Sequence, residues 1–88
     1  MGPELWNRTV VSCLAGYRAD ERPISFVTRE TKFMVRGIVK SWREPNYSYF
    51  RIEAEDGRVY DLRRHESEDY WEVREYATAS GRGGYRGR

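Results

Sequence analysis

The chain has 88 residues, of which 34% are charged and 39% hydrophobic, with a net charge of +2. This length fits one small domain, and no apolar run approaches the roughly 18 residues that a membrane-spanning helix needs. The single cysteine, Cys13, excludes a disulfide within the chain. A lone cysteine and a first segment without a signal-peptide pattern favour a reducing, cytoplasmic setting.

The positive charge is unevenly distributed along the sequence. Residues 81–88 contain three arginines and no acid, and subtracting them from the 16 basic residues leaves 13 against 14 acidic ones. The rest of the chain therefore carries a net charge of −1. We expect attraction to phosphate groups to come mainly from this tail.

Residues 1–31 predict an N-terminal arm followed by two strands. The arm, 1–7, contains Trp6. Residues 8–17, RTVVSCLAGY, are rich in β-branched side chains and predict a first strand that ends at Gly16. After a polar connection, residues 24–27 predict a second short strand, and residues 28–31 predict a polar turn.

Residues 32–43, KFMVRGIVKSWR, predict the longest strand. Phe33 and Val35 point one way, whereas Ile38 and Trp42 take the even positions. Gly37 lies where this alternation changes phase, which indicates a β-bulge or a sharp bend. A helix is the alternative for this segment, since its apolar residues also fit a helical period.

The stretch 49–62, YFRIEAEDGRVYDL, predicts a β-hairpin, because Asp-Gly between alternating apolar runs is a strong turn signal. A two-residue loop would put the apolar residues of the two strands on opposite faces. A three-residue loop, 55–57, with Gly57 in the left-handed region as a bulge, puts them on one face. The pattern favours this second register, which sets Arg51 opposite Asp61 on the outer face. The interior residues are then Phe50, Ile52, Tyr60 and Leu62.

The remaining segments complete an all-β domain. Residues 63–69 predict a charged loop, with a continuation of the preceding strand through Arg64 as the alternative. Residues 70–76, YWEVREY, predict a last strand with Trp71 and Val73 on one face. We predict one domain over 8–76, a small antiparallel meander of five or six strands that curls into a barrel or half-barrel. Residues 77–88 are predicted to be a disordered Arg/Gly-rich tail. Trp42 and Trp71 are expected to fill the core, and Trp6 to cover a barrel end or dock on a partner.

Five segments occur in order along the chain: ERPISF (21–26), WREP (42–45), YFRI (49–52), DGRVYDL (56–62) and WEV (71–73). Their order and spacing resemble a family of small bacterial proteins that carry a domain of unknown function. They are more distantly similar to a domain found with translesion-type DNA polymerases in some bacteria, although LRRH (62–65) stands where those relatives end in a YYDR-like sequence. The resemblance implies a nucleic-acid context but no activity and no site, and it does not cover the tail.

The tail sequence RGGYRGR (82–88) is typical of RGG-like segments that contact RNA. Arginine binds phosphate and stacks on bases, tyrosine stacks, and glycine lets the backbone follow the strand. The alternative is a short solubilising tail. A second candidate surface is the outer face of the hairpin, where aromatic residues alternate with arginines, although nearby acids also fit an ordinary solvated face. The candidate nucleic-acid-binding residues are Arg82, Tyr85, Arg86 and Arg88, with Tyr49, Arg51, Arg63 and Arg64 as weaker candidates.

No catalytic, metal or cofactor site is predicted. His65 has no second histidine near it in sequence, and metal sites want three or four ligands at suitable spacing. The acids near the turn and in the loop 63–69 could act as an acid–base pair only if burial separated their pKa values. No phosphate-cradling loop occurs.

We therefore predict a non-enzymatic accessory module that binds RNA, DNA or a nucleoprotein assembly, partly through its tail, and that has no membrane partner. The alternative is a protein-interaction module, which pairs a sheet edge or the N-terminal arm with a partner chain or with a second copy as a homodimer. A small-ligand or enzymatic role inside the barrel is a third alternative.

Overall fold

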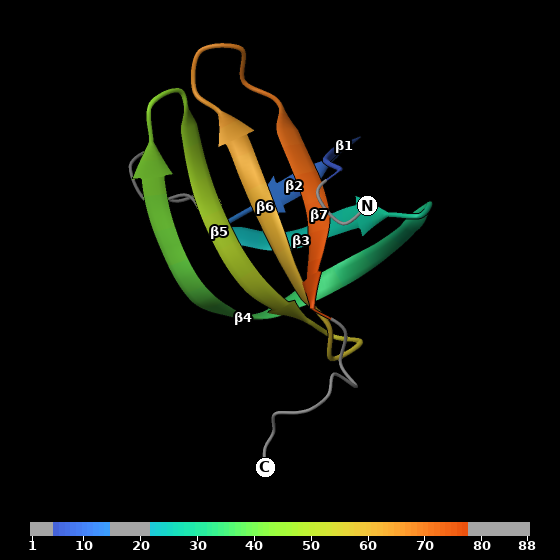
Figure 1. Cartoon of the computed structure of the whole chain (residues 1–88). Coiled ribbons are helices and arrows are strands. Elements are labelled where there is room, and N and C mark those ends of the chain that lie inside the picture. The colour runs from blue at the N-terminus through green and yellow to red at the C-terminus, as the bar shows by residue number, and fades with distance from the viewer. Residues whose placement is uncertain (1–4, 15–21, 78–88) are drawn as a thin grey trace.

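The computed structural model describes residues 5–14 and 22–77, and all regular structure in these residues is β-strand. They contain no helix that is long and apolar enough to span a membrane. The strands pair antiparallel in the order β1-β7-β6-β5-β4-β3-β2 (Figure 1). The strands are β1 (Asn7–Thr9), β2 (Val11–Cys13), β3 (Pro23–Thr28), β4 (Thr31–Glu44), β5 (Tyr47–Ala54), β6 (Val59–His65) and β7 (Trp71–Ala77). The all-β antiparallel fold is thus confirmed. The disordered tail predicted over 77–88 begins too early, because Ala77 is the last residue of β7 and pairs with Val59, and its other residues lie outside the described ones.

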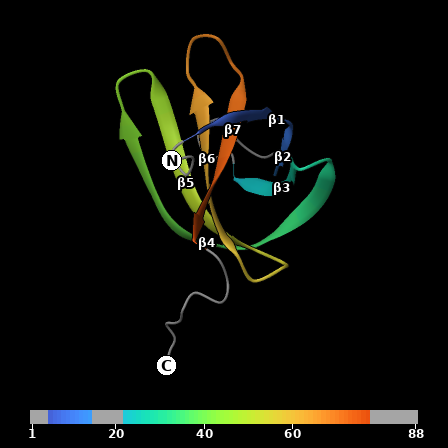
Figure 2. The ribbon, with the colours of Figure 1, turned by 45° about the vertical axis from the view of Figure 1, so that its right-hand side comes forward.

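The two ends of the sheet meet where β1 passes into β2, which Figure 2 shows from the side. Only Val10 separates these strands, yet β1 pairs with β7 and β2 pairs with β3. The Thr9 hydroxyl spans the gap to β3, because it accepts a hydrogen bond from the Val27 amide at 3.1 Å and donates one to the Val27 carbonyl. The sheet therefore nearly closes into a barrel.

The first predicted strand is therefore divided in two. The sequence predicted a single strand over 8–17, but β1 begins at Asn7 and β2 ends at Cys13. The division at Val10 arises because the two halves serve different neighbours. The predicted end at Gly16 lies outside the described residues.

Strand β4 belongs to both walls of the barrel. Its first residues, Thr31 to Met34, pair with β3 across the turn predicted at 28–31, and its later residues pair with β5. The pairing with β5 shifts register twice, between Val35 and Gly37 and between Ile38 and Lys40. The bulge predicted at Gly37 is confirmed, and the helical alternative for this segment is wrong.

The central hairpin has the predicted register. Phe50 pairs with Leu62 and Ile52 pairs with Tyr60. Gly57 has a φ of 85°, and the loop is closed by hydrogen bonds of 2.9 Å between Ala54 and both Gly57 and Arg58. The left-handed conformation explains why a glycine stands at this position.

The core lies between β3, β5, β6 and β7. Its buried apolar residues are Phe26, Ile52, Ala54, Tyr60, Leu62 and Val73. Phe50 and Trp71 are half-buried and pack against this cluster. The prediction that Trp42 also fills the core is wrong, because the second bulge at Val39 reverses the alternation and sets Trp42 beside Tyr49 on the opposite face.

Candidate nucleic-acid interface

The sheet face opposite the core collects aromatic and basic side chains from four strands. Cross-strand partners share a face, so the register places Arg51 beside Lys40 and Asp61, and Arg63 beside Tyr49 and Glu72. Trp6 and Arg8 join this face from the arm and from β1 through ring contacts. We call this surface the aromatic–arginine face. It consists of Trp6, Arg8, Lys40, Trp42, Glu44, Tyr47, Tyr49, Arg51, Asp61, Arg63, His65, Tyr70, Glu72, Arg74 and Tyr76.

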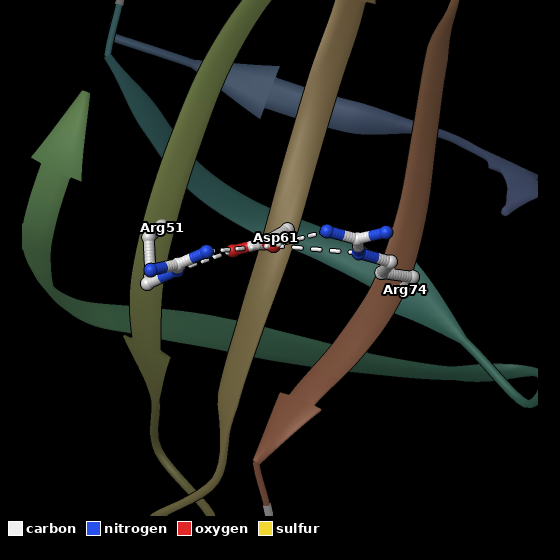
Figure 3. Close-up of polar contacts among 3 residues, drawn as sticks. All are labelled: Arg51, Asp61 and Arg74. Atoms are coloured by element: carbon white, nitrogen blue, oxygen red, sulfur yellow. Dashed lines mark hydrogen bonds and ion pairs between the residues drawn. The ribbon is translucent and has the colours of Figure 1, made fainter. Parts of the chain in front are cut away.

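A buried carboxylate holds the centre of the face together. Arg51 on β5, Asp61 on β6 and Arg74 on β7 lie in a row across the three strands (Figure 3). Arg51 donates from Nε to Asp61 Oδ1 at 2.8 Å and from Nη2 to Oδ2 at 3.3 Å, while Arg74 Nη2 donates to Oδ2 at 3.2 Å. The Asp61 side chain is 0% exposed, although it points away from the core. Two guanidinium groups satisfy it, and the hydrogen bond with Asp61 raises the pKa of Arg51.

Aromatic rings stack on the guanidinium groups of these arginines. The Arg51 guanidinium lies 3.6 Å from the centre of the Tyr76 ring, and the Arg63 guanidinium lies between Trp6 at 4.1 Å and Tyr47 at 4.2 Å. Such distances are within the range of attractive cation–π contacts. The stacked rings help to cover the ion pairs beneath them.

A second ion pair fixes Arg63 in the same way. Its Nε donates to Glu72 Oε1 at 2.7 Å. Partial burial lowers the pKa of Arg63, but the hydrogen bonds with Glu72 and Tyr49 outweigh this effect, so the pKa is raised overall. The Arg63 guanidinium is therefore charged, and its contact with Glu72 fixes the orientation of its plane.

The margins of the face hold further rings and cations. On the β4 side, Trp42 stacks on Tyr49 with 4.9 Å between centroids and 3° between planes, and Lys40 Nζ lies 5.2 Å from the Trp42 ring. On the β7 side, the Arg8 guanidinium lies 3.8 Å from the Tyr70 ring, which stacks on His65. Lys40, Arg8 and Tyr76 are the exposed members of the face.

The face concentrates positive charge. It contains five cations, namely Arg8, Lys40, Arg51, Arg63 and Arg74, against three acids, Glu44, Asp61 and Glu72, which leaves a net charge of +2. A further acid, Glu53, lies at its margin and pairs with Arg36 at 3.6 Å. A positive surface thus exists within the folded domain, in addition to the arginines of the tail.

The structure brings three of the predicted site residues together. Tyr49, Arg51 and Arg63 share the aromatic–arginine face, although they are half-buried and each stacks on neighbouring rings of that face. Arg64 is separate, because it points to the core side at one end of the barrel and pairs with Asp69 at 3.1 Å. The predicted tail residues Arg82, Tyr85, Arg86 and Arg88 lie outside the described residues.

Several residues of the face were missed by the sequence reasoning. The alternation in 70–76 already placed Arg74 and Tyr76 opposite Trp71, so the register of β6 and β7 would have added them. Trp42 can be assigned to this face only if the second bulge in β4 is known, and no glycine marks that bulge. Trp6 depends on the path of the arm, for which the sequence has no periodic signal.

A separate polar cluster lies around the central turn. The Tyr60 hydroxyl donates to Asp56 Oδ2 at 3.0 Å and accepts a hydrogen bond from Arg29 Nη2 at 3.3 Å. Burial raises the pKa of Tyr60, against the opposing effect of Arg29, so its hydroxyl stays protonated and serves as a donor. Asp56 Oδ1 also accepts from the Arg58 amide at 3.0 Å. This cluster fixes the loop between β5 and β6.

Among residues 5–14 and 22–77, no three His, Cys, Asp or Glu side chains lie close enough together to hold a metal ion. Comparison of the chain with models of known protein families, with curated proteins and with solved structures found no match. The family resemblance stays a prediction, and a functional proposal has to rest on the geometry of the aromatic–arginine face.

Proposed function

We propose that the protein is a non-enzymatic module that binds single-stranded RNA or DNA on its aromatic–arginine face. The observation that carries this proposal is the gathering of rings and guanidinium planes on one sheet face with a net charge of +2. Unpaired bases stack on aromatic rings and on arginine planes, and their phosphates are attracted to a basic surface.

The ion pairs within the face determine which chemistry each residue contributes. Arg51 and Arg63 are held by acids, so their charge is largely compensated and their planes are fixed in orientation. They support the rings stacked on them, and a rigid platform loses little entropy on binding. The exposed cations Lys40 and Arg8 supply the phosphate contacts, and Tyr76, which is 52% exposed, supplies an accessible ring.

The RGG-like tail adds to this binding in the proposal. Its three arginines neutralise about three phosphates at most, so the tail by itself gives weak and salt-sensitive affinity. Together with the face, it extends the contacted length of the strand. The expected dissociation constant for an unspecific single strand is about 1–100 µM.

Fluorescence anisotropy of a labelled single strand of about 12 nucleotides tests the ring contact. Tyr76→Ala is expected to weaken binding about tenfold, whereas Tyr76→Phe, which keeps the ring, should bind like the unmodified protein. A double-stranded oligonucleotide serves as the comparison ligand, because its bases are not available for stacking. The proposal is rejected if single strands produce no anisotropy change at about 100 µM protein in 50 mM salt.

A pair of lysine variants tests the phosphate contact. Lys40 and Lys32 are both exposed on β4, but only Lys40 lies on the aromatic–arginine face. We expect Lys40→Ala to weaken binding and to lower the slope of log affinity against log salt by about 1, with Lys32→Ala unchanged. Removal of residues 81–88 measures how much the tail contributes to the affinity. If both lysine variants behave alike, the face is not the binding surface.

A further inference from the structure

Within residues 5–14 and 22–77, strand β4 has an edge that no other strand pairs with. Its pairing with β3 stops at Met34, and from Ile38 to Glu44 it pairs with β5 on one side only. No other described strand covers its second side, and β4 is the outermost strand there in Figure 1. The bulge at Val39 and the turn residue Pro45 interrupt regular pairing at either end. The edge available to a new strand is therefore the segment 40–44.

The turn at the end of β4 determines which backbone groups face outward. Pro45 and Asn46 form a two-residue loop, so the flanking residues Glu44 and Tyr47 direct their N–H and C=O groups toward each other. The direction alternates along the strand. The N–H and C=O groups of Ser41 and Arg43 consequently point away from β5, toward the open side.

We propose that two copies of the chain pair antiparallel through the segments 40–44, about a two-fold axis at Trp42. The backbone N–H and C=O groups of Ser41 in one copy then form hydrogen bonds with those of Arg43 in the other copy. On the aromatic–arginine face, Lys40 of each copy then lies opposite Glu44 of the other copy. The interface thus contains two complementary charge pairs around a central pair of Trp42 side chains.

The charges select this register from its neighbours. One segment can shift along the other only by two residues at a time. The N–H and C=O groups of Ser41 and Arg43 must lie opposite residues whose own N–H and C=O groups also point outward. An axis at Arg43 would set two Arg43 side chains against each other, which is repulsive. An axis at Ser41 would set Lys40 opposite Trp42 and leave Glu44 without a cation. Only the axis at Trp42 satisfies both Lys40 and Glu44.

This pairing closes on itself and is weak. A two-fold dimer uses the segment 40–44 of both copies, which leaves neither segment open to a third copy, so this pairing does not grow into a filament. Five residues on each side make an interface well below the standard size, and we expect a dissociation constant above about 10 µM. The dimer joins the two aromatic–arginine faces into one surface, because Lys40, Trp42 and Glu44 share that face.

Sedimentation equilibrium from about 10 µM to about 1 mM protein, without nucleic acid, tests the dimer. Lys40→Glu and Glu44→Lys each create two like-charge pairs and are expected to raise the dissociation constant at least about tenfold. The double variant Lys40→Glu/Glu44→Lys restores both pairs and should dimerise like the unmodified chain. Lys32→Glu, outside the segment, is the matched control and should change little.

A mixture of the two single variants gives the sharpest outcome. A Lys40→Glu copy and a Glu44→Lys copy complement each other at both charge pairs, so equal amounts should form a heterodimer although neither variant dimerises alone. An unmodified chain that stays monomeric at about 1 mM overturns the proposal. So does a mixture that stays monomeric while the unmodified chain dimerises. These results do not depend on whether nucleic acid binds, since none is present.

Discussion

Two glycines place different demands on the backbone at the scale of single residues. Gly57 closes the central hairpin with a φ of 85°, a conformation that a Cβ disfavours. Gly37 lies at the first bulge of β4 and has no positive φ, and an added Cβ would meet no atom within 4 Å. Both glycines mark an irregularity in the sequence, but only Gly57 is required by its conformation.

Alanine substitution should distinguish the two positions. We expect Gly57→Ala to lower the free energy of unfolding by about 1 kcal/mol or more, because alanine in the left-handed region is strained. Gly37→Ala should leave the free energy of unfolding unchanged or raise it by up to about 1 kcal/mol, since alanine restricts the unfolded chain. Urea denaturation of both variants checks this, and equal losses at the two positions would contradict it.

Substitution of Asp61 is also expected to lower the free energy of unfolding strongly. Asp61→Asn removes the charge that two arginines share, and we expect a loss of about 2–3 kcal/mol in the free energy of unfolding, since both arginines stay partly exposed at 19% and 26%. Asp69→Asn is the matched control, because Asp69 pairs with Arg64 but is 73% exposed, and it should change stability by less than about 1 kcal/mol. Losses of the same size would show that the arrangement around Asp61 contributes no more than a surface ion pair.

At the scale of elements, the divided strand β1–β2 determines the shape of the barrel. Its first half continues the sheet from β7, and its second half continues it from β3. Between them, the Thr9 hydroxyl satisfies the amide and the carbonyl of Val27, which would otherwise lack a strand partner at this point. A side chain thus substitutes for a rung of the backbone ladder.

Thr9→Val tests this closure, since valine has nearly the same shape but no hydroxyl. We expect the free energy of unfolding to fall by about 1–2 kcal/mol, because the partly buried polar groups of Val27 lose their partner. Thr9→Ser keeps the hydroxyl and should retain most of the stability. Thermal and urea denaturation provide the measurement, and a Thr9→Val protein at least as stable as Thr9→Ser would show that the bridge is dispensable.

The elements differ in how far the sequence predicts them. The register of the central hairpin followed from Phe50, Ile52, Tyr60, Leu62 and the Asp-Gly turn, because local chemistry specifies it. The bulge at Val39 has no glycine to mark it, so the face of Trp42 was assigned wrongly. The pairing of β1 with β7 joins distant segments and leaves no periodic signal. Trp6 and Arg8 could not be added to the candidate site without it.

At the scale of the whole molecule, the domain has one layer of side chains on each side of its sheet. The inner layer is a small apolar core, to which the described part of the chain contributes six buried residues. The outer layer consists of rings stacked on ion-paired arginines, which cover the Asp61 carboxylate. A small chain therefore supports a sheet with both faces packed, and the second layer doubles as the proposed binding surface.

The closure of the barrel by β1 and β2 has a consequence for how the protein folds during synthesis. Of the strands described, β1 leaves the ribosome first and β7 last, yet these two pair with each other. The intervening strands can form hairpins as they emerge, but the barrel cannot shut until β7 has been synthesised. Until then the gap between β1 and β7 is open, and apolar residues such as Val11 and Phe26 are exposed to solvent. A chaperone that binds the nascent chain would therefore bind at these residues.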